Sequence, residues 1–366
     1  MTIKEMLNRY YMGVFLFVKP IMALTSKVKL GKVKSRSLYL RCVMSLFVGC
    51  DLGGTNLRAA LVNVQNGEVL RQKTTATLAR QGPESVMSRM ATLIFEVIQE
   101  ANHSPEEVQG IGIGAPGLLD LEKGETIFLT NLAGNWPHVP LQATIQRITS
   151  IRTVLINDVR AITFGEWRFG AGQGVETMVV LALGTGVGGG LVINGQLHLG
   201  LSGSAGELGH IVLDPNGPRC GCGNFGCLEV YASGPAIAAM GVKMVAQGFA
   251  TRIAELCEGD YNRINAALIA RAAQEGDPIA MEIYERAGQA LGRAAAMLCV
   301  TLSPQRIVLT GGVARAGDLL LEPMQQTMRK MVRVMPVERV ELVLGTLGDQ
   351  AGVIGAACFA AQKINV

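Results

Sequence analysis

The sequence predicts an α/β protein built from two lobes, and three observations lead to that prediction. First, the chain has 366 residues, more than twice the ~150 residues typical of one domain. Second, hydrophobic residues make up 49% of the chain and charged residues 17%, a balance that excludes a disordered or collagen-like protein. Third, short apolar runs that end in glycine-rich loops alternate with helix-like patterns. The 45 glycines exceed the ~7% of average usage, so these loops are where a bound ligand is expected.

The first 43 residues differ in composition from the rest of the chain. They hold nine Lys or Arg and one Glu, which leaves 24 basic and 28 acidic residues in 44–366. The net charge of +4 therefore does not indicate a nucleic-acid-binding surface on the body of the protein. The apolar run Tyr10–Val18 is shorter than the ~20 residues of a membrane span, although it also resembles part of a signal peptide. We expect 1–43 to be a basic extension, or a stretch upstream of a true start at Met44, that can be deleted without loss of activity.

The elements of the body follow from the positions of the apolar runs. Asn66-Gly67 is typical of a two-residue hairpin turn, so two antiparallel strands follow the first loop, unlike the Rossmann fold, in which a helix follows. We expect one lobe at 44–157, completed by a C-terminal helix near 347–366, and a second lobe at 158–346. Strands are expected at 46–49, 57–64, 68–73, 108–114, 153–156, 178–183 and 306–309, and long helices at 83–101 and 277–302.

Glycine-rich loops follow three of the expected strands. The first loop is Asp51–Thr55, the second begins at Gly184, and the third is Thr310–Val313. The first two can present consecutive backbone N–H groups and a Thr hydroxyl to a phosphate, because Gly allows positive φ values and close approach. Neither ends in Lys-Ser/Thr, so this is not a P-loop protein. A single loop of this kind is equally compatible with an ordinary tight turn, but one in each half favours phosphate binding. The third loop could pass under an adenine or ribose. The candidate cofactor-binding residues are Asp51, Gly53, Gly54, Thr55, Gly184, Thr185, Gly186, Gly311 and Gly312.

Three of the eight cysteines lie within eight residues, at Cys220, Cys222 and Cys227, ten residues after His210. Three thiolates and one imidazole form a tetrahedral zinc set, and the intervening glycines let closely spaced ligands reach one ion. The alternative is a group of free buried thiols beside a core histidine. Because four protein ligands leave no open position, the zinc would be structural, and the loop 210–229 would depend on it.

The strongest candidate for catalysis is Asp158, which follows the expected strand at 153–156. A carboxylate at the C-terminal end of a strand is well placed to accept a hydroxyl proton in phosphoryl transfer. The alternative is that Asp158 caps a helix that starts at Val159. Glu207 and Glu229 flank the cysteine loop and are typical acceptors for sugar hydroxyls, or else ordinary surface carboxylates.

Together these motifs resemble the ROK family of sugar kinases and related repressors. The resemblance covers the chain from Met44 to the C-terminus and is nearest to bacterial ATP-dependent glucokinases. It implies an actin-like (ribonuclease H-like) fold, with ATP and sugar bound between two lobes. It rests on Asp51-Leu-Gly-Gly-Thr55, Gly112-Ile-Gly-Ala-Pro-Gly117, Asn157-Asp158, Leu183-Gly-Thr-Gly186, Gly206-Glu-Leu-Gly-His210, the run from Cys220 to Glu229, and Tyr231-Ala-Ser-Gly234.

The resemblance also implies a role for each candidate residue. Asp158 would be the general base toward the sugar 6-hydroxyl, and Thr55 with the glycine loops would contact phosphates. One ring nitrogen of His210 would bind zinc, which would fix the other for a sugar hydroxyl. One departure from the family is Arg160, in place of the usual Asn, and we expect it to change the charge near the rim of the cleft. The implied sugar contacts are Asn131, Asn157, Glu207, His210 and Glu229.

The function expected from these residues is ATP-dependent phosphorylation of a hexose, with glucose as the leading substrate. Alternatives are a kinase for fructose, mannose or an N-acetylhexosamine, and a sugar-responsive repressor. The repressors carry an N-terminal helix-turn-helix domain, and 1–43 has no recognisable pattern of that kind. We expect Mg²⁺ and a structural zinc as cofactors, a cytoplasmic homo-oligomer (a dimer or tetramer), and neither nucleic acid nor membrane as a partner.

Overall fold

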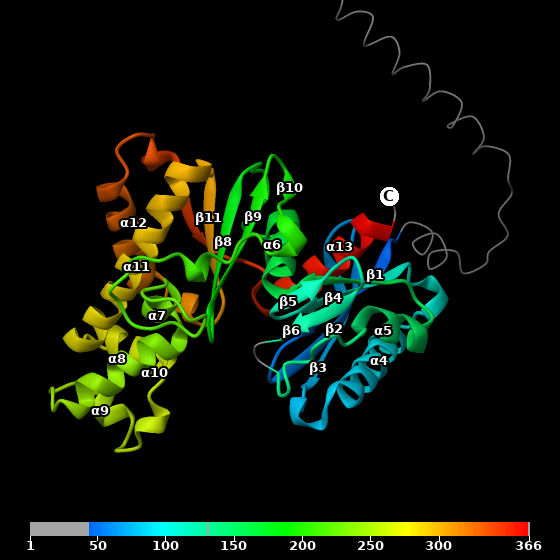
Figure 1. Ribbon diagram of the computed structural model, residues 1–366, viewed down its shortest axis with the longest axis horizontal. Helices are drawn as coiled ribbons and strands as arrows, with labels where there is room; N and C mark the ends of the chain where they lie inside the picture. Colours follow the sequence, from blue (N-terminus) through cyan, green and yellow to red (C-terminus); the bar gives the residue numbers. More distant parts are fainter. Residues whose placement is uncertain (1–43, 130–131, 365–366) are drawn as a thin grey trace, which may run out of the picture. The chain divides into compact units, whose positions relative to one another are not determined.

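The computed structural model describes residues 44–129 and 132–364 of the chain. The expected extension at 1–43 and the expected sugar contact Asn131 therefore lie outside the described residues. From Ser45 onward the chain forms one unit whose described part contains two five-stranded sheets and a small hairpin (Figure 1). No described helix combines the length and the apolar character that a membrane span requires.

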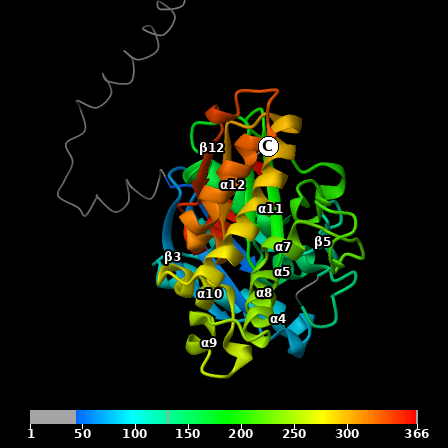
Figure 2. The same ribbon diagram turned by 90° about the vertical axis from the view of Figure 1, so that its left-hand side faces the viewer.

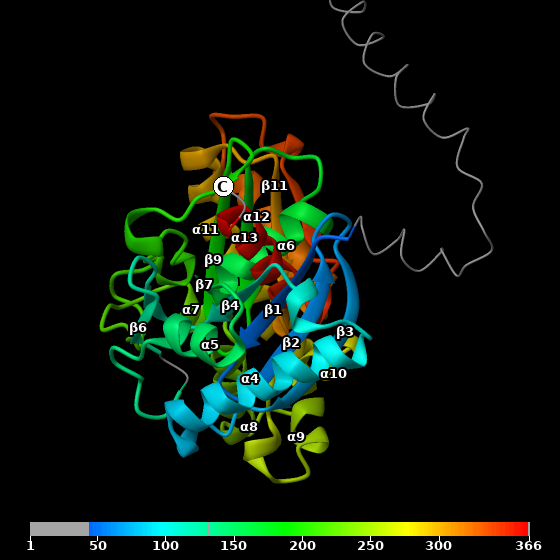
Figure 3. The same ribbon diagram turned by 90° about the vertical axis from the view of Figure 1, so that its right-hand side faces the viewer.

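The first sheet has the strand order β3-β2-β1-β4-β7. Its first three strands pair antiparallel, whereas β4 and β7 run parallel to β1, so β1, β4 and β7 end at the same edge of the sheet. Helices α4 and α5 cover one face of this sheet (Figure 3). The elements are β1 (Leu46–Leu52), β2 (Asn56–Asn63), β3 (Glu68–Ala76), β4 (Gly110–Ala115), β7 (Thr153–Asn157), α4 (Pro83–Glu100) and α5 (Leu141–Thr149), and the hairpin is β5 (Leu118–Asp120) with β6 (Glu125–Phe128).

The second sheet has the order β10-β9-β8-β11-β12, and alternate residues of its strands enter two different cores. On β8, Leu181 and Leu183 pack into the core under α11 and α12, whereas Met178 and Val180 face α6. Helices α11 and α12 cover the outer face (Figure 2). The elements are β8 (Met178–Leu183), β9 (Val187–Ile193), β10 (Gln196–Leu197), β11 (Arg306–Thr310), β12 (Glu341–Leu344), α6 (Asp158–Phe169), α7 (Glu229–Ala232), α8 (Gly234–Ala246), α9 (Arg252–Leu256), α10 (Ala266–Gln274), α11 (Pro278–Leu302) and α12 (Asp318–Met331).

Helix α13 (Ala351–Ile364) packs directly on the backbone of the first sheet. Glycine is required at Gly49 on β1 and Gly112 on β4, because a Cβ atom at either position would overlap a carbonyl oxygen of α13. On its other side α13 crosses α6, where a Cβ atom on Gly355 would overlap the carbonyl oxygen of Ala161. The last helix of the chain therefore lies between the first sheet and α6.

The expected strands and long helices all occur, with bounds that shift by at most three residues. The hairpin turn between β2 and β3 differs from the prediction, because its loop spans residues 64–67 instead of two residues. Of Asn66 and Gly67, only Gly67 has a positive φ, of 75°. The Asn66 side chain instead accepts a hydrogen bond from the backbone N–H of Glu68 at 3.1 Å.

Candidate functional site

Two carboxylates stand at the edge where β1, β4 and β7 end. Asp51 lies near the end of β1, and Asp158 directly follows β7 as the first residue of α6. Between these strands, a Cβ atom on Gly114 of β4 would lie 3.5 Å from the Cα atom of Asp158. The parallel strands thus place both acids where open α/β sheets bind ligands.

The environment of Asp158 favours its neutral form. Burial, and next the negative charge of Asp51, raise the pKa of Asp158 from 3.8 to about 6. The backbone N–H of Val159 donates to its Oδ1 at 2.8 Å and opposes this shift, as does the charge of Arg160. A carboxylate with a pKa close to neutral suits a general base, because it is mostly ionised at pH 7 and still basic enough to accept a proton.

Asp51 is held by a cross-strand partner that the sequence analysis did not identify. Burial raises the pKa of Asp51, and Asp349 adds to the rise, but Arg58 opposes it with its Nη1 atom 3.2 Å from Oδ2. Arg58 lies directly opposite Asp51 in the β1–β2 register. β1 ends at Leu52 and β2 begins at Asn56, so the short turn at 53–55 sets this pairing and is the sequence signal that would have predicted it.

Asn157, not Asp158, caps helix α6. Its side-chain oxygen accepts from the backbone N–H groups of Val159, at 3.0 Å, and Arg160, at 3.3 Å. The side-chain amide of Asn157 donates to the carbonyl oxygen of Gly117 at 3.2 Å. The alternative in which Asp158 caps a helix starting at Val159 is therefore wrong, and the Asp158 carboxylate is not needed as a cap.

Arg160 does not lie at the rim of the cleft, as the sequence analysis expected. Its side chain is only 2% exposed and reaches across to the segment before His210. It bonds to the side chains of Asn157 and Glu207 and to two carbonyl oxygens, those of Ser204 and Ala205.

A narrow cleft adjoins these groups. It is lined by residues from three parts of the chain: Gly117, Leu118, Leu119, Leu121, Asn157, Leu199, Ser202, Gly203, Ser204 and Glu207. Glu207, whose side chain is 47% exposed, contributes a carboxylate to this lining. Two of the residues expected to bind the sugar, Asn157 and Glu207, thus come together.

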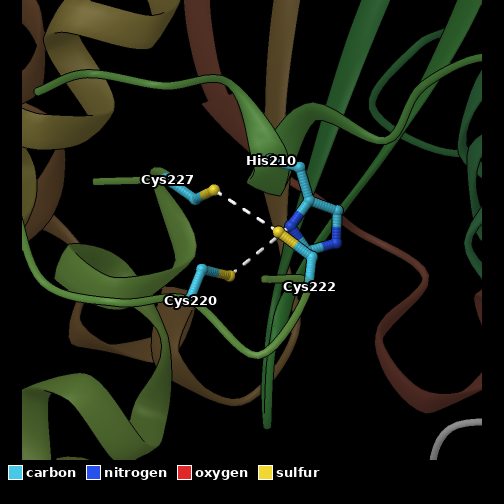
Figure 4. A group of neighbouring side chains, drawn as sticks. All are labelled: His210, Cys220, Cys222 and Cys227. Carbon is cyan, nitrogen blue, oxygen red and sulfur yellow. Dashed lines mark hydrogen bonds between the residues drawn. The ribbon is translucent and has the colours of Figure 1, made fainter. Parts of the chain in front are cut away.

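The side chains of His210, Cys220, Cys222 and Cys227 point toward one another, as the sequence predicts (Figure 4). Their ligand atoms all lie within 4.8 Å of one another. The Sγ atoms of Cys222 and Cys227 are 3.7 Å apart, close to the ~3.8 Å edge of a tetrahedron with zinc–sulfur bonds of about 2.3 Å. The Nδ1 atom of His210 lies 3.7 Å from the Cys220 sulfur, so Nδ1 faces the cluster. Donor types and separations both fit zinc.

The segment 210–229, called the cysteine finger below, is a short loop closed by tight turns. The Cys220 N–H donates to the Asn224 carbonyl at 2.7 Å, and Val212 pairs with Cys227 in an antiparallel bridge. At Gly226, where φ is 63°, a side chain would overlap the backbone of Asp214. These contacts bring together four side chains that span residues 210–227 of the sequence.

Glu229 connects the finger with the second glycine loop. Its Oε2 atom accepts the backbone N–H of Val187 at 3.0 Å, and its Oε1 atom lies 3.7 Å from the Cys220 sulfur. Val187 is the residue after Gly186, so Glu229 fixes the end of the loop 184–186. At the same edge of the second sheet, Gly311 has a φ of 92° and lies against the carbonyl oxygen of Leu183.

None of the glycines in the two expected phosphate loops, Gly53, Gly54, Gly184 and Gly186, has the predicted positive φ; among the candidate cofactor-binding glycines only Gly311, of the third loop, has one. At Gly53 and Gly186 a side chain would have too little room. A Cβ atom on Gly53 would lie 2.9 Å from the Asn56 carbonyl oxygen, and a Cβ atom on Gly186 would overlap the Glu229 side chain. Gly184 has no atom within 4 Å of its missing Cβ atom. That open side leaves room for a ligand to approach the backbone.

Comparison with known proteins shows where this arrangement recurs. The model of the ROK family matches residues 47–363. The glucokinase of Thermotoga maritima is 37% identical over 321 residues, which are 87% of this chain and 98% of that enzyme. The N-acetylmannosamine kinase of Escherichia coli O1:K1 is 31% identical over 316 residues, which are 86% of this chain and 98% of that enzyme.

Solved structures give the same picture. A ROK family glucokinase from Streptomyces griseus, in complex with glucose and AMPPNP, is 32% identical with a TM-score of 0.75, and the match covers 87% of this chain and 99% of that one. A ROK family transcriptional regulator, a homolog of the E. coli MLC protein, is 30% identical with a TM-score of 0.76. The match covers 87% of this chain and 78% of that one. The two-lobed, actin-like α/β fold that the sequence predicts is therefore confirmed.

Proposed function

Because this chain belongs to the ROK family, we propose that it transfers the terminal phosphoryl group of ATP to the 6-hydroxyl of a hexose, with glucose as the main substrate. The observation that carries this proposal is Asp158, a strand-end carboxylate whose pKa is raised to about 6 beside the cleft. The similarity to glucokinases extends over nearly the whole length of those enzymes. The reaction is an ATP-dependent hexose kinase reaction, which yields the hexose 6-phosphate and ADP.

The roles of the residues follow from their positions. Asp158 accepts the proton of the attacking hydroxyl, while Asn157 and Glu207, which are both bonded to Arg160, contact the sugar together. The backbone N–H groups around Thr55 and Gly184–Gly186 bind the phosphates, and the ribose or adenine lies near Gly311-Gly312. The Asp51 carboxylate suits Mg²⁺, which takes one or two carboxylates together with phosphate oxygens and neutralises the transferred group.

The zinc cluster supports the sugar site and not the chemistry. Four protein ligands leave no position for a reacting group, so zinc bound there would stabilise the finger. With Nδ1 of His210 directed to the cluster, Nε2 is available to a sugar hydroxyl, and Glu229 lies next to the second glycine loop. Since ATP is the donor, we place the enzyme in the cytoplasm, and we expect a homo-oligomer there.

The experiment that tests the proposal is a turnover assay with the Asp158→Ala variant. Loss of the base should lower kcat by about 10²–10⁴-fold, while glucose binding, measured by calorimetric titration, should change little. In the unmodified enzyme, kcat/KM should fall as the pH drops through about 6, because protonated Asp158 cannot accept a proton. A variant that keeps more than about a tenth of the original kcat would exclude Asp158 as the base.

A screen of ATP with hexoses and N-acetylhexosamines separates the kinase alternatives. The similarity to an N-acetylmannosamine kinase makes that sugar the most informative competitor. Because a ROK regulator has the same fold, a gel-shift assay with the upstream DNA tests the repressor function separately. We expect no specific retention of that DNA, with or without sugar.

A further inference from the structure

Arg160 is the most extensively bonded buried charge beside the cleft. Its Nη1 atom donates to Asn157 Oδ1 at 2.9 Å, and its Nη2 atom donates to Glu207 Oε1 at 2.6 Å. Nε donates to the Ala205 carbonyl oxygen at 2.9 Å, and Nη2 also contacts the Ser204 carbonyl oxygen at 3.2 Å. One guanidinium thus joins the start of α6 to the segment 204–207, which is far away in sequence.

The segment that Arg160 holds has no regular secondary structure to fix it. Ser202 has a φ of 53° and Gly206 a φ of 95°, so the chain turns sharply on either side of the two carbonyl oxygens. For Glu207, no side-chain hydrogen bond other than the one to Arg160 is found within 44–129 and 132–364. Without Arg160, this carboxylate would therefore adopt several rotamers, and its side-chain entropy would oppose sugar binding.

We propose that Arg160 is a positioning residue for the sugar: its planar fork holds Asn157 and Glu207 at a fixed separation, so that both meet one hexose ring together. The inference rests on the proposed function, because it takes Asn157 and Glu207 as sugar contacts. The fork geometry matters as well as the charge. Lysine has a single ammonium group with three donors, so it cannot make all four of the side-chain hydrogen bonds that Arg160 makes.

A purely structural role is the competing explanation, and the chain offers a matched control. Arg306, at the start of β11, also pairs with a carboxylate, that of Glu341, and donates to the carbonyl oxygens of Ala171 and Gln173. It lies at the opposite end of the second sheet from the glycine loops. Arg306→Met therefore removes the same kinds of bond without touching the cleft.

The experiment compares Arg160→Met, Arg160→Lys and Arg306→Met for thermal stability, glucose affinity and ATP affinity. We expect Arg160→Met to raise both the KM and the Kd for glucose at least about tenfold, because Asn157 and Glu207 each lose a charge-assisted hydrogen bond from Arg160. The KM for ATP should stay within about twofold of the original. Arg160→Lys should fall between Arg160→Met and the unmodified enzyme. Arg306→Met should lower the melting temperature only.

A double-mutant cycle with Glu207→Gln tests whether Arg160 acts through Glu207. In the Glu207→Gln background, Arg160→Met should raise the glucose Kd much less than it does alone, whereas additive effects would overturn the proposal. Equal glucose affinities in the Arg160→Met and Arg306→Met variants would also overturn it.

Two further outcomes are decisive. If Arg160→Met does not fold, the Lys variant decides, and a glucose KM within about twofold of the original would contradict the positioning role. If the unmodified enzyme phosphorylates no hexose, the proposed function fails. If the unmodified enzyme phosphorylates glucose but the Arg160 substitutions leave the glucose affinity unchanged, only the positioning role fails.

Discussion

The burial of Asp158, which suits the base role proposed for it, has a cost in stability. Burial disfavours the charged form of this carboxyl in the folded protein. Because its pKa is raised from 3.8 to about 6, the folded state binds the proton more tightly than the unfolded state does. The stabilisation from the protonated form is complete below pH about 4 and is lost as the pH rises through about 6.

Asp158→Asn should therefore stabilise the protein while it inactivates it. Asn resembles the protonated acid and still accepts from the Val159 N–H. At pH 7.5 we expect the free energy of unfolding to rise by about 1–3 kcal/mol, since each pKa unit corresponds to ~1.4 kcal/mol, and the gain should vanish at pH 4. Chemical denaturation at both pH values measures this.

The control is Asp318→Asn, at the start of α12, where loss of a negative charge at a helix N-terminus should destabilise slightly. If Asp158→Asn is destabilising at pH 7.5, the environment of Asp158 is not the one described.

Single residues were predictable when the signal was local. The position of Asp158 follows from the strand before it, and the cluster of His210, Cys220, Cys222 and Cys227 follows from its spacing. Arg160 was misplaced because its partners lie more than 40 residues away, at Glu207 and the carbonyl groups before it. Only the fold of the segment 201–207 shows that a charged residue in the first turn of a helix is buried.

At the scale of elements, the cysteine finger shows how little regular structure a site needs. It contains two isolated bridges, and its ligands converge because of turns at Gly223 and Gly226. The sequence predicted the ligand set but not the contact from Glu229 to Val187, which links the finger to the second glycine loop. That contact depends on how α7 meets the start of β9, which no spacing pattern reveals.

Cys222→Ser should release the metal and loosen the finger. Cys222 is the exposed ligand, so the change removes one thiolate without opening a cavity. Zinc content should fall from about one per chain to nearly none, and limited proteolysis should cut within 211–226.

Cys257→Ser, outside the cluster, is the matched control, because its Sγ already donates to the Ala254 carbonyl oxygen as a hydroxyl would. A Cys222→Ser protein that retains stoichiometric zinc would show that the four residues are not the ligand set.

At the scale of the whole unit, the two sheets are joined through α6 and α13. The sequence analysis expects a C-terminal helix near 347–366, and it gives a helix from Val159 only as the alternative in which Asp158 is its cap. It could not show that Gly49 and Gly112 are small in order to admit α13, or that Gly355 on α13 is small in order to admit α6, because each glycine meets a residue from a distant part of the chain. Glycine-rich sequence thus had two meanings, ligand approach and helix packing, that only the fold distinguishes.

The return of the chain from the second sheet to α13 depends on one fully buried carboxylate, that of Glu166 near the end of α6. It accepts the backbone N–H groups of Ala171 at 2.9 Å, Thr346 at 3.1 Å and Leu347 at 3.0 Å. Glu166→Gln would turn an amide N–H₂ toward at least one of these donors. We expect the free energy of unfolding to fall by about 1.5–3 kcal/mol and hydrogen exchange at 346–347 to accelerate.

The control is Glu341→Gln, at the exposed carboxylate that pairs with Arg306. This change should lower the free energy of unfolding by less than ~1 kcal/mol. Removing the buried charge of Glu166 would by itself stabilise the protein, but the three N–H groups that donate to the carboxylate favour its charged form. If Glu166→Gln leaves the free energy of unfolding unchanged or raises it, Glu166 does not hold α6 to the segment before α13.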